Sequence, residues 1–483
     1  MQRVLDRLAP EAVFRFFEDL CQIPHGSRNT KAISDYCVAF ARVRGLWVYQ
    51  DELNNVIIKK PASAGYEAAP TLILQGHLDM VAEKDADCPL DLSRDGLQLC
   101  VEGDRIFAQG TTLGGDDGIA VAMALAVLDS PTLAHPPLEA VFTVDEEIGM
   151  EGAQGLDYSQ LSGRRMLNID SEDEGVFTVS CAGGASAHVH IPMHSGPYTG
   201  IGARLCVSGL TGGHSGQEID KGRANANVLL GRVLALLLEK LPVRLAEAAG
   251  GQKDNAIPNT AWAQLAMDEA TLCAAAELVA TCAAQLRAEY AQTEPMLHLS
   301  LERTQPLTQA LCPESALRAV RFLLLVPNGI AEMSRDIPGL VQTSCNLGIF
   351  MLDAQALRAV SSVRSSVASQ KQMLLTRFDA LCALLGGTLR VTGAYPAWEY
   401  RRVSPLRETL AAVYTRQTGT QPKIEAIHAG LECGLFAGAL DGLDCVSFGP
   451  DLTDIHTTRE CMSIASVQRT WAFLTAVLAE LKH

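Results

Sequence analysis

Acidic residues and histidines follow several short apolar runs of this chain, and this pattern constrains the fold most. Each run has the length and composition of a buried β-strand. In open α/β sheets, functional groups gather just beyond the carboxyl ends of the strands. The sequence therefore predicts an α/β sheet with a polar site along one edge. The runs are Thr71–Leu74, Leu138–Val144 and Met166–Ile169, and the polar residues that follow them are His77, Asp79, Glu146, Glu147 and Asp170.

His77 and Asp79 lie two residues apart beyond the first of these runs. Residues two apart on an extended chain face the same way, so the two side chains can act together. A metal-bound imidazole needs an acceptor for its other ring nitrogen, and a carboxylate at this spacing can provide it. The pair therefore indicates a metal-binding histidine supported by an acid.

Glu146 and Glu147 are adjacent beyond the second run. Neighbouring residues on an extended chain point in opposite directions, so one glutamate can bind metal while the other reaches into a cleft. A metallohydrolase needs this division, because one carboxylate holds the ion while another carries the proton of the attacking water. Asp170 is the best placed ligand beyond the third run, with Asp173 and Glu174 as nearby alternatives.

A glycine-rich segment, Gly110–Gly118, precedes the alanine-rich stretch Ile119–Leu128, whose composition is typical of a helix. Asp116 and Asp117 therefore lie at a predicted helix start. A carboxylate there can bridge two cations, but it can equally cap the helix by accepting main-chain N–H groups. This segment alone leaves both interpretations open.

Taken together, these segments resemble those of the M20 metallopeptidases, and within that family the aminoacyl-histidine dipeptidases. The resemblance spans nearly the whole chain. Each motif is weak alone, but all of them occur in order. The matching stretches are Gln75–Val81, Gly110–Gly118, Asp145–Gly149, Leu167–Gly175, Gly212–Gly216, Gly222–Ala226, Asp254–Pro258, Ser362–Ser366, His428–Cys433, and Phe448–Pro450 leading to His456.

The resemblance implies a centre of two zinc ions per chain. Asp116 is expected to bridge the ions, with His77 and Asp170 completing the ligands of one. Glu147 and His456 are expected to complete those of the other. Oxygen and nitrogen ligands suit zinc, but cobalt or manganese can occupy such a site.

The resemblance also implies the reaction, which is hydrolysis of Xaa-His dipeptides such as carnosine (β-Ala-His). Glu146 is expected to be the general base and later the acid, acting on a hydroxide shared between the ions. Asp79 is expected to orient His77, as the strand spacing indicates independently. The preference for a C-terminal histidine rests on the resemblance alone.

Four residues in the middle and later parts of the chain are expected to contact the substrate. The resemblance implies that His214 stabilises the oxyanion, although taken alone it could sit in a mobile surface turn. Asn255 and Arg364 are expected to hold the terminal carboxylate, a task that suits the planar fork of arginine. Gly430 is expected to offer main-chain contacts. Closure of a lid that carries His214 is expected to precede chemistry.

Two segments depart from the family pattern. The family often has His-Ser-Pro-x-Glu around its last ligand, whereas this chain has Thr457 and Thr458 between His456 and Arg459-Glu460. Asn259 stands after Pro258 where an arginine is expected. These changes affect the local backbone near one ligand and the charge of the substrate pocket.

The composition indicates a large soluble enzyme with small substrates. The chain has 483 residues, 48% of them hydrophobic, which suffices for several cores. Its formal net charge is −16, so nucleic acid and anionic membranes are expected to be repelled. The first ten residues carry charges where a signal peptide needs an apolar core, and no apolar stretch is long enough to span a membrane. The 14 cysteines are scattered, which favours reduced thiols in a cytoplasmic protein.

Strands and helices alternate along the chain, which predicts a mixed sheet flanked by helices. Because His456 lies far beyond Asp170, the zinc-peptidase catalytic domain is expected to be discontinuous, with an inserted α+β lid. The predicted boundaries are residues 1–183 and 376–483 for the catalytic domain and residues 184–375 for the lid. Further predicted strands are Val56–Lys59, Ala203–Leu210, Leu297–Leu301 and Val341–Phe350, and further predicted helices are Lys31–Arg44, Asn225–Leu241 and Glu269–Gln292.

Two other functions fit parts of this pattern. Another M20 amidohydrolase, such as an N-acyl amino acid hydrolase, keeps the metal ligands but lacks a pocket for a free amino terminus. A catalytically silent peptide-binding relative is less consistent, because Glu146 and Asp79 are both present. The family also suggests a homodimer.

Overall fold

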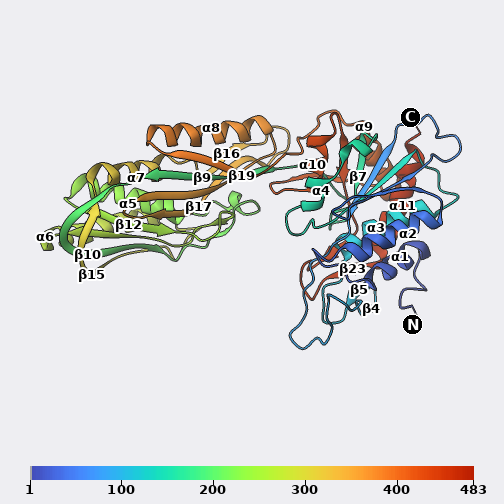
Figure 1. Cartoon of the computed structure of the whole chain (residues 1–483), viewed down its shortest axis with the longest axis horizontal. Helices are drawn as coiled ribbons and strands as arrows, with labels where there is room; N and C mark the ends of the chain where they lie inside the picture. The colour runs from blue at the N-terminus through green and yellow to red at the C-terminus, as the bar shows by residue number, and fades with distance from the viewer. Residues whose placement is uncertain (1–2, 483) are drawn as a thin grey trace. The chain divides into compact units, whose positions relative to one another are not determined.

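The computed structural model describes residues 3–482, which form two compact units (Figure 1). The first unit contains the chain up to Cys181, the segment Tyr400–Ala426, and the chain from Leu431 onward. The second unit contains Ala182–Glu399 and the short segment Ile427–Gly430. The second unit is therefore an insertion into the first.

The first unit is built on an eight-stranded mixed sheet. Its four inner strands β6, β3, β7 and β21 run parallel. In sheet order, the strands are β1 (Trp47–Gln50), β2 (Val56–Lys60), β6 (Leu138–Thr143), β3 (Leu72–His77), β7 (Arg165–Asn168), β21 (Asp444–Ser447), β8 (Val176–Cys181) and β20 (Lys423–Ile427).

The inner strands explain why the site forms at one edge of this sheet. Every residue of β3 and β6 is buried, as expected for parallel strands covered on both faces. Gln75 pairs with Asn168 and His77 pairs with Thr143, so the carboxyl ends of β3, β6 and β7 lie side by side. The predicted strands that precede the candidate ligands are confirmed.

Helices and a small second sheet complete the first unit. The helices are α1 (Glu11–Cys21), α2 (Lys31–Val43), α3 (Gly115–Asp129), α4 (Glu151–Gly155), α9 (Pro405–Thr418), α10 (Glu432–Ala439) and α11 (Ile464–Glu480), with a 3₁₀ turn at Tyr158–Gln160. The small sheet has the order β22 (Leu452–Thr453), β23 (Cys461–Ser463), β5 (Arg105–Ala108) and β4 (Leu99–Glu102).

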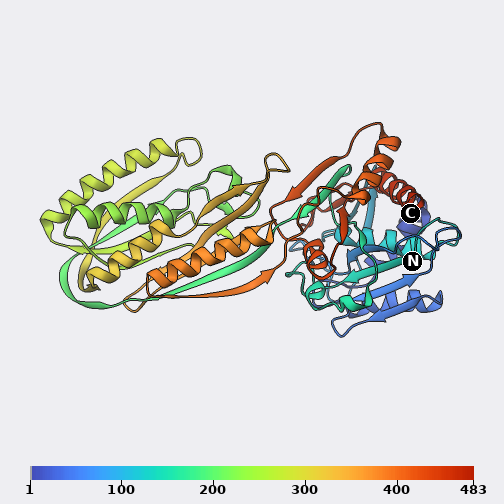
Figure 2. The same ribbon diagram turned by 90° about the horizontal axis from the view of Figure 1, so that it is seen from above.

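The second unit is an α+β domain built on an antiparallel sheet. Burial alternates along β9 and β18, which is typical of a sheet with one covered face. Helices pack against that face (Figure 2). The strands are β15 (His298–Leu311), β10 (Ser195–Ser208), β14 (Ala261–Met267), β12 (Arg244–Gly250), β17 (Val341–Leu352), β18 (Ala356–Ser365), β9 (Gly183–Pro192) and β19 (Thr388–Tyr395), with β16 (Gly329–Met333) beside β17.

The remaining elements of the second unit confirm the predicted helices. The helices are α5 (Ala226–Lys240), α6 (Glu269–Glu289), α7 (Pro313–Leu325) and α8 (Ala368–Leu384), with a 3₁₀ turn at Ile219–Lys221. A separate two-stranded ladder joins β11 (Gly213–His214) to β13 (Ala256–Ile257).

The second boundary of the insertion differs from the prediction. The predicted return to the catalytic domain at residue 376 falls inside α8. This helix contacts β9, β18 and β19, and β19 itself pairs with β9. Because these contacts are all internal to the second unit, that unit extends to Glu399.

None of the helices among residues 3–482 combines the length and apolar character needed to cross a membrane.

Packing of α8 can be tested by removing its buried ring. Phe378 is fully buried in the core of the second unit, whereas Leu384 on the same helix is 82% exposed. We expect Phe378→Ala to lower the free energy of unfolding of the second unit by about 3–5 kcal/mol, because a cavity replaces the ring. Leu384→Ala should change it by less than about 0.5 kcal/mol. Urea denaturation measures both, and equal effects would contradict the packing of α8.

Candidate metal centre

His77 is the last residue of β3 and is buried. Its Nδ1 donates a hydrogen bond to the main-chain oxygen of Asp79 at 2.9 Å, and the carboxylate of Asp79 lies 3.5 Å from the same nitrogen. Because Nδ1 carries the proton of the neutral ring, the lone pair of Nε2 is available for a metal ion. The predicted pairing of His77 with Asp79 is present, but the hydrogen-bond acceptor is the main-chain oxygen of Asp79 rather than its carboxylate.

Asp79 also holds the segment that carries the two glutamates. Its carboxylate accepts the main-chain N–H groups of Glu146 at 3.0 Å and Glu147 at 3.3 Å. The hydroxyl of Ser27 donates to it at 2.8 Å. One buried carboxylate thus connects the end of β3 with the turn that follows β6.

Asp116 lies between two histidines. Its Oδ1 is 3.2 Å from Nε2 of His77, and its Oδ2 is 3.2 Å from Nε2 of His456. Each oxygen of this carboxylate therefore faces a different ring. This is the geometry that a carboxylate needs to bridge two cations.

The remaining candidate ligands lie on either side of Asp116. Oε1 of Glu147 is 2.9 Å from Nε2 of His456, and Oδ1 of Asp170 is 3.9 Å from Nε2 of His77. Although Oε1 of Glu147 is buried and close to His456, no hydrogen-bond donor is aligned with it. An oxygen in that condition can accept a metal ion.

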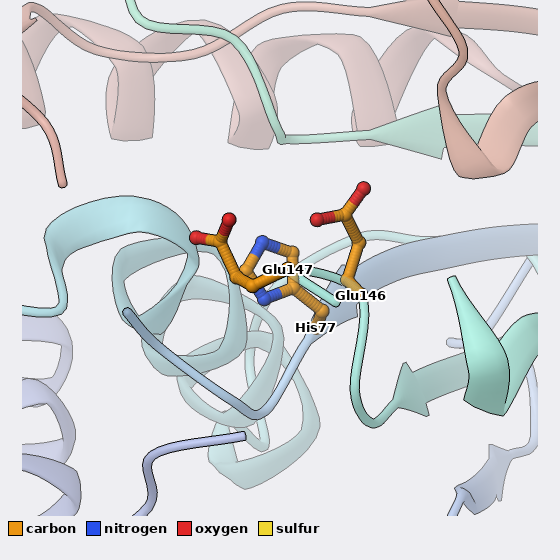
Figure 3. Close-up of side chains that lie close together, drawn as sticks. All are labelled: His77, Glu146 and Glu147. Atoms are coloured by element: carbon orange, nitrogen blue, oxygen red, sulfur yellow. The ribbon is translucent and has the colours of Figure 1, made fainter. Parts of the chain in front are cut away.

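Glu146 points away from Glu147. Figure 3 shows the two carboxylates on opposite sides of the His77 ring, although Glu147 lies in a turn and not on the extended chain that the sequence predicted. Glu146 also comes within ligand reach of the other two, since the ligand atoms of His77, Glu146 and Glu147 lie within 4.8 Å of one another.

Two overlapping groups fit a pair of metal ions. His77, Asp116 and Asp170 form one group, and Asp116, Glu147 and His456 form the other, each with ligand atoms within 4.8 Å of one another. Asp116 belongs to both. Imidazole nitrogens and carboxylate oxygens are ligands for zinc and for other divalent transition metals.

Glu460 organises the loop that presents Asp116. This buried carboxylate accepts the main-chain N–H groups of Leu113 at 2.8 Å, Gly114 at 3.2 Å and Gly115 at 2.8 Å. Gly114 is the residue before α3, with φ +67, and it has no side-chain cap. The capping interpretation of Asp116 and Asp117 is therefore wrong, because the carboxylate comes from a distant part of the chain.

The charges of the site shift its histidines toward the protonated form. Burial lowers the pKa of His77, but hydrogen bonds to Asp116 and Asp79 outweigh burial and raise the pKa well above its usual value. The nearby carboxylates of Asp116 and Glu147 raise the pKa of His456 to about 10. Both rings thus respond to a strongly negative site.

The same concentration of charge acts on the acids. Burial raises the pKa of Asp170 well above its usual value, and the charges of Asp116 and Glu146 add to the shift. Burial likewise raises the pKa of Glu146 to about 7, with a contribution from Glu147. Positive charge placed among these groups relieves the repulsion, which again fits a metal centre.

The two alternatives to Asp170 lie elsewhere. Glu174 accepts two hydrogen bonds from Arg469, at 2.7 and 2.6 Å. Asp173 is exposed and belongs to none of the candidate metal groups among the described residues. The geometry therefore favours Asp170.

The four predicted substrate contacts, His214, Asn255, Arg364 and Gly430, belong to the second unit. Nδ1 of His214 accepts the N–H groups of Gly216 at 3.3 Å and Gln217 at 3.1 Å. The main-chain oxygen of Asn255 accepts the N–H of Ser215 at 2.8 Å.

Gly216 lies between His214 and Arg364. A Cβ atom at this glycine would stand 3.0 Å from Cε1 of His214 and 3.3 Å from Cζ of Arg364. Asn255 is exposed, and Gly430 lies in the short segment Ile427–Gly430. His214 and Arg364 are therefore close neighbours within the second unit.

The model of the peptidase family M20/M25/M40 matches residues 73–480. The chain belongs to this family. It is therefore a peptide hydrolase of a metal-dependent group, and its described residues include candidate metal groups.

Individual relatives agree over the whole chain. The cytosol non-specific dipeptidase of Escherichia coli (strain K12) is 37% identical over 99% of both chains. The crystal structure of the aminoacylhistidine dipeptidase from Vibrio alginolyticus is 36% identical, with a TM-score of 0.94 over 99% of this chain and 98% of that one. The aminopeptidase PepT of Bacillus cereus ATCC 10987 shares the fold at 16% identity, with a TM-score of 0.56 over 99% of this chain and 100% of that one.

Two buried acids near the site had no predicted role. Glu460 and Glu432 both lie within motifs that resemble the family, but their partners are residues far away in the sequence. The only signal in the sequence was that each acid is near a predicted functional residue. Glu460 comes four positions after His456, and Glu432 comes two positions after Gly430.

Because Glu460 holds the loop that presents Asp116, we expect metal affinity to fall when its carboxylate is removed. Glu460→Ala leaves buried N–H groups of the Asp116 loop without an acceptor, so Asp116 is held less firmly. We expect zinc affinity to fall about 10–100-fold. Chelator competition measures this affinity. The control is Asp104→Ala, which removes a carboxylate that accepts the N–H of Ala465 in a solvent-exposed position. An equal loss of zinc affinity in Asp104→Ala would contradict this role of Glu460.

Proposed function

We propose that this chain is a cytosolic dipeptidase with two zinc ions, which hydrolyses Xaa-His dipeptides such as β-Ala-His. The observation that carries the proposal is Asp116, whose two oxygens face His77 and His456. A carboxylate shared between two ligand groups suits a two-metal hydrolase.

The residues that would hold the ions are divided by Asp116. His77 and Asp170 would bind on one side, and Glu147 and His456 on the other. When bound, such ions lower the pKa of water to about 7 and polarise a carbonyl oxygen. Asp79 would keep Nε2 of His77 directed at the site through its contacts with Nδ1.

Glu146 is proposed as the group that moves the proton. It would accept a proton from the attacking water and return it to the nitrogen of the leaving amine. Its main-chain N–H is tied to Asp79, which supports a fixed starting position for the side chain. Burial raises its pKa to about 7, which suits a group that both takes and gives a proton near neutral pH.

His214 is proposed as the donor to the developing oxyanion. Its Nδ1 accepts two main-chain N–H groups, so the proton of the neutral ring is on Nε2. Burial and the charge of Arg364 lower the pKa of this ring, which favours the neutral form. The proposal requires the second unit to deliver His214 to the substrate during turnover.

Arg364 and Asn255 are proposed to bind the terminal carboxylate of the dipeptide, and Gly430 to contact it through the main chain. Nε of Arg364 is buried and has no hydrogen-bond partner, so part of its donor capacity is unused. Gly216 leaves space between Arg364 and His214, because any side chain there would press on both. A small anionic group fits beside such a guanidinium.

The most specific part of the proposed function is the preference for a C-terminal histidine. The name of the Vibrio relative supports it, whereas the name of the Escherichia coli relative points to broad specificity. The latter name also supports a cytosolic location. Asn259, which stands where an arginine was expected, is exposed and close to Gly212 in the second unit. A homodimer stays a prediction, which light scattering would test.

Metal removal and a single substitution test the reaction. We expect chelated protein to be inactive and zinc to restore cleavage of β-Ala-His, Ala-His and Ala-Ala, with the His dipeptides cleaved fastest. Glu146→Gln should retain zinc but lose at least about 100-fold in kcat, because the proton carrier is gone. Chromatographic detection of released amino acids measures each rate. A Glu146→Gln variant as active as the original chain would refute this role of Glu146.

Adding N-acetyl-His to these substrates distinguishes a dipeptidase from an N-acyl amino acid hydrolase. N-acetyl-His has no free amino terminus, so a dipeptidase should leave it intact. Cleavage of N-acetyl-His without cleavage of Ala-His would identify an N-acyl amino acid hydrolase. Faster cleavage of Ala-Ala than of both His dipeptides would retain the dipeptidase and contradict the preference for histidine.

The proposed oxyanion donor predicts a specific kinetic defect. We expect His214→Ala to lower kcat about 100- to 1,000-fold with a small change in KM, because the lost hydrogen bond forms in the transition state. His190→Ala is the matched control, since His190 is an exposed histidine of the same unit. Steady-state kinetics with Ala-His checks both. A defect confined to KM would contradict the assignment.

A further inference from the structure

A second layer of polar side chains lies next to the candidate ligands in the sheet. Gln75 precedes His77 by two positions on β3, and Asn168 precedes Asp170 by two. Thr143 is the last residue of β6, three positions before Glu146. These three side chains are at most 2% exposed. Asn168 and Thr143 end β7 and β6, and Gln75 pairs with Asn168, so all three lie just before the candidate metal groups.

Glu432 joins these three side chains from outside the sheet. It is the first residue of α10 and is fully buried. Its Oε2 accepts hydrogen bonds from Nε2 of Gln75 and from Oγ1 of Thr143, both at 2.6 Å. Oε1 of Gln75 in turn accepts a hydrogen bond from Nδ2 of Asn168 at 2.5 Å. One carboxylate thus contacts the ends of β3 and β6 directly and reaches β7 through Gln75.

Such a group is costly to bury. Burial raises the pKa of Glu432 to about 8, and the charge of Glu146 adds to the shift. Its Oε1 has no hydrogen-bond partner, although the atom is buried. A buried, partly satisfied carboxylate lowers stability relative to an apolar residue, so the fold alone does not account for it. A role at the neighbouring candidate metal centre would account for the burial of this carboxylate.

The hydrogen bonds also fix the direction of the Gln75 amide. The NH₂ group of Gln75 donates to Glu432, and the amide oxygen of Gln75 accepts from Asn168. The main-chain ladder holds the strands in register, but it does not orient side chains at their ends. Glu432 supplies that second constraint.

We infer that Glu432 is a positioning residue for the metal centre, acting through Gln75, Thr143 and Asn168. Its carboxylate holds together the strand ends that lead into His77, Glu146 and Asp170. The inference rests on the proposed metal function of those groups. It assigns Glu432 no contact with substrate or metal.

The same strand offers a matched control. Glu139 is a buried carboxylate near the opposite end of β6, 2% exposed. It accepts main-chain N–H groups from Ser162 and Gly163 and a hydrogen bond from Nζ of Lys59. Glu139→Gln therefore perturbs a buried acid of the same sheet, away from the candidate ligands.

The experiment compares Glu432→Gln, Thr143→Val and Glu139→Gln with the original full-length chain. Thr143→Val keeps the shape of the side chain and replaces the hydroxyl with a methyl group. It therefore still tests the inference if Glu432→Gln does not fold. Zinc affinity is measured by chelator competition, unfolding by urea denaturation of the metal-free proteins, and kcat and KM at saturating zinc. We expect a 10–100-fold loss of zinc affinity in Glu432→Gln and about a tenfold loss in Thr143→Val.

At saturating zinc, Glu432→Gln and Thr143→Val should each lose kcat with KM little changed. A double variant that combines these two substitutions should lose less zinc affinity, in free energy, than the sum of the two single losses. Glu139→Gln should lose stability but keep zinc affinity. Original affinity in both site variants, or an equal loss in Glu139→Gln, would overturn the positioning role while the dipeptidase proposal stands. Failure of the original chain to bind zinc would overturn the metal centre and this inference together.

Discussion

The concentration of negative charge at one edge of a sheet is the constraint on which the rest of this structure depends. Asp116 shares one candidate metal group with Asp170 and another with Glu147, each with ligand atoms within 4.8 Å of one another. Low polarity there strengthens the repulsion between the carboxylates. Burial and the neighbouring carboxylates raise the pKa of Asp170, and contacts with carboxylates raise the pKa values of His77 and His456. The fold maintains the arrangement because the ligands come from separate, rigid segments, and divalent cations are the charge that such an arrangement accommodates.

Three further carboxylates hold the ligand segments without belonging to the predicted ligand set. Asp79 connects His77 with the turn after β6, and Glu460 holds the loop before Asp116. Glu432 links side chains at the ends of β3, β6 and β7. Each accepts several N–H or O–H groups, so the negative charge that costs stability also supplies the acceptors that organise the site. Outer residues of this kind set the orientation of metal ligands in proteins generally.

The two units divide the predicted chemistry between them. The metal groups belong entirely to the first unit, whereas His214 and Arg364 are held close together by the glycine between them in the second. Both α8 and β19 belong to the second unit, where they complete its helical layer and its sheet. The chain therefore returns to the first unit at Tyr400. In the proposed function this division has a purpose, because hydrolysis of a dipeptide needs both a metal-activated water and groups that hold the substrate.

The sequence by itself determined the inner strands, the polar residues that follow them, and the pairing of His77 with Asp79, because these depend on local periodicity and on spacing of two residues. The ordered motifs also determined the family. Only the tertiary structure decided that α8 belongs to the insertion, that Glu460 rather than a local side chain serves the Asp116 loop, and that Glu432 reaches Gln75. The contacts of Glu460 and Glu432 join residues 347 and 357 positions apart, and α8 packs on β9 at the start of the second unit. No local pattern encodes such contacts; they follow from how the sheets and helices pack.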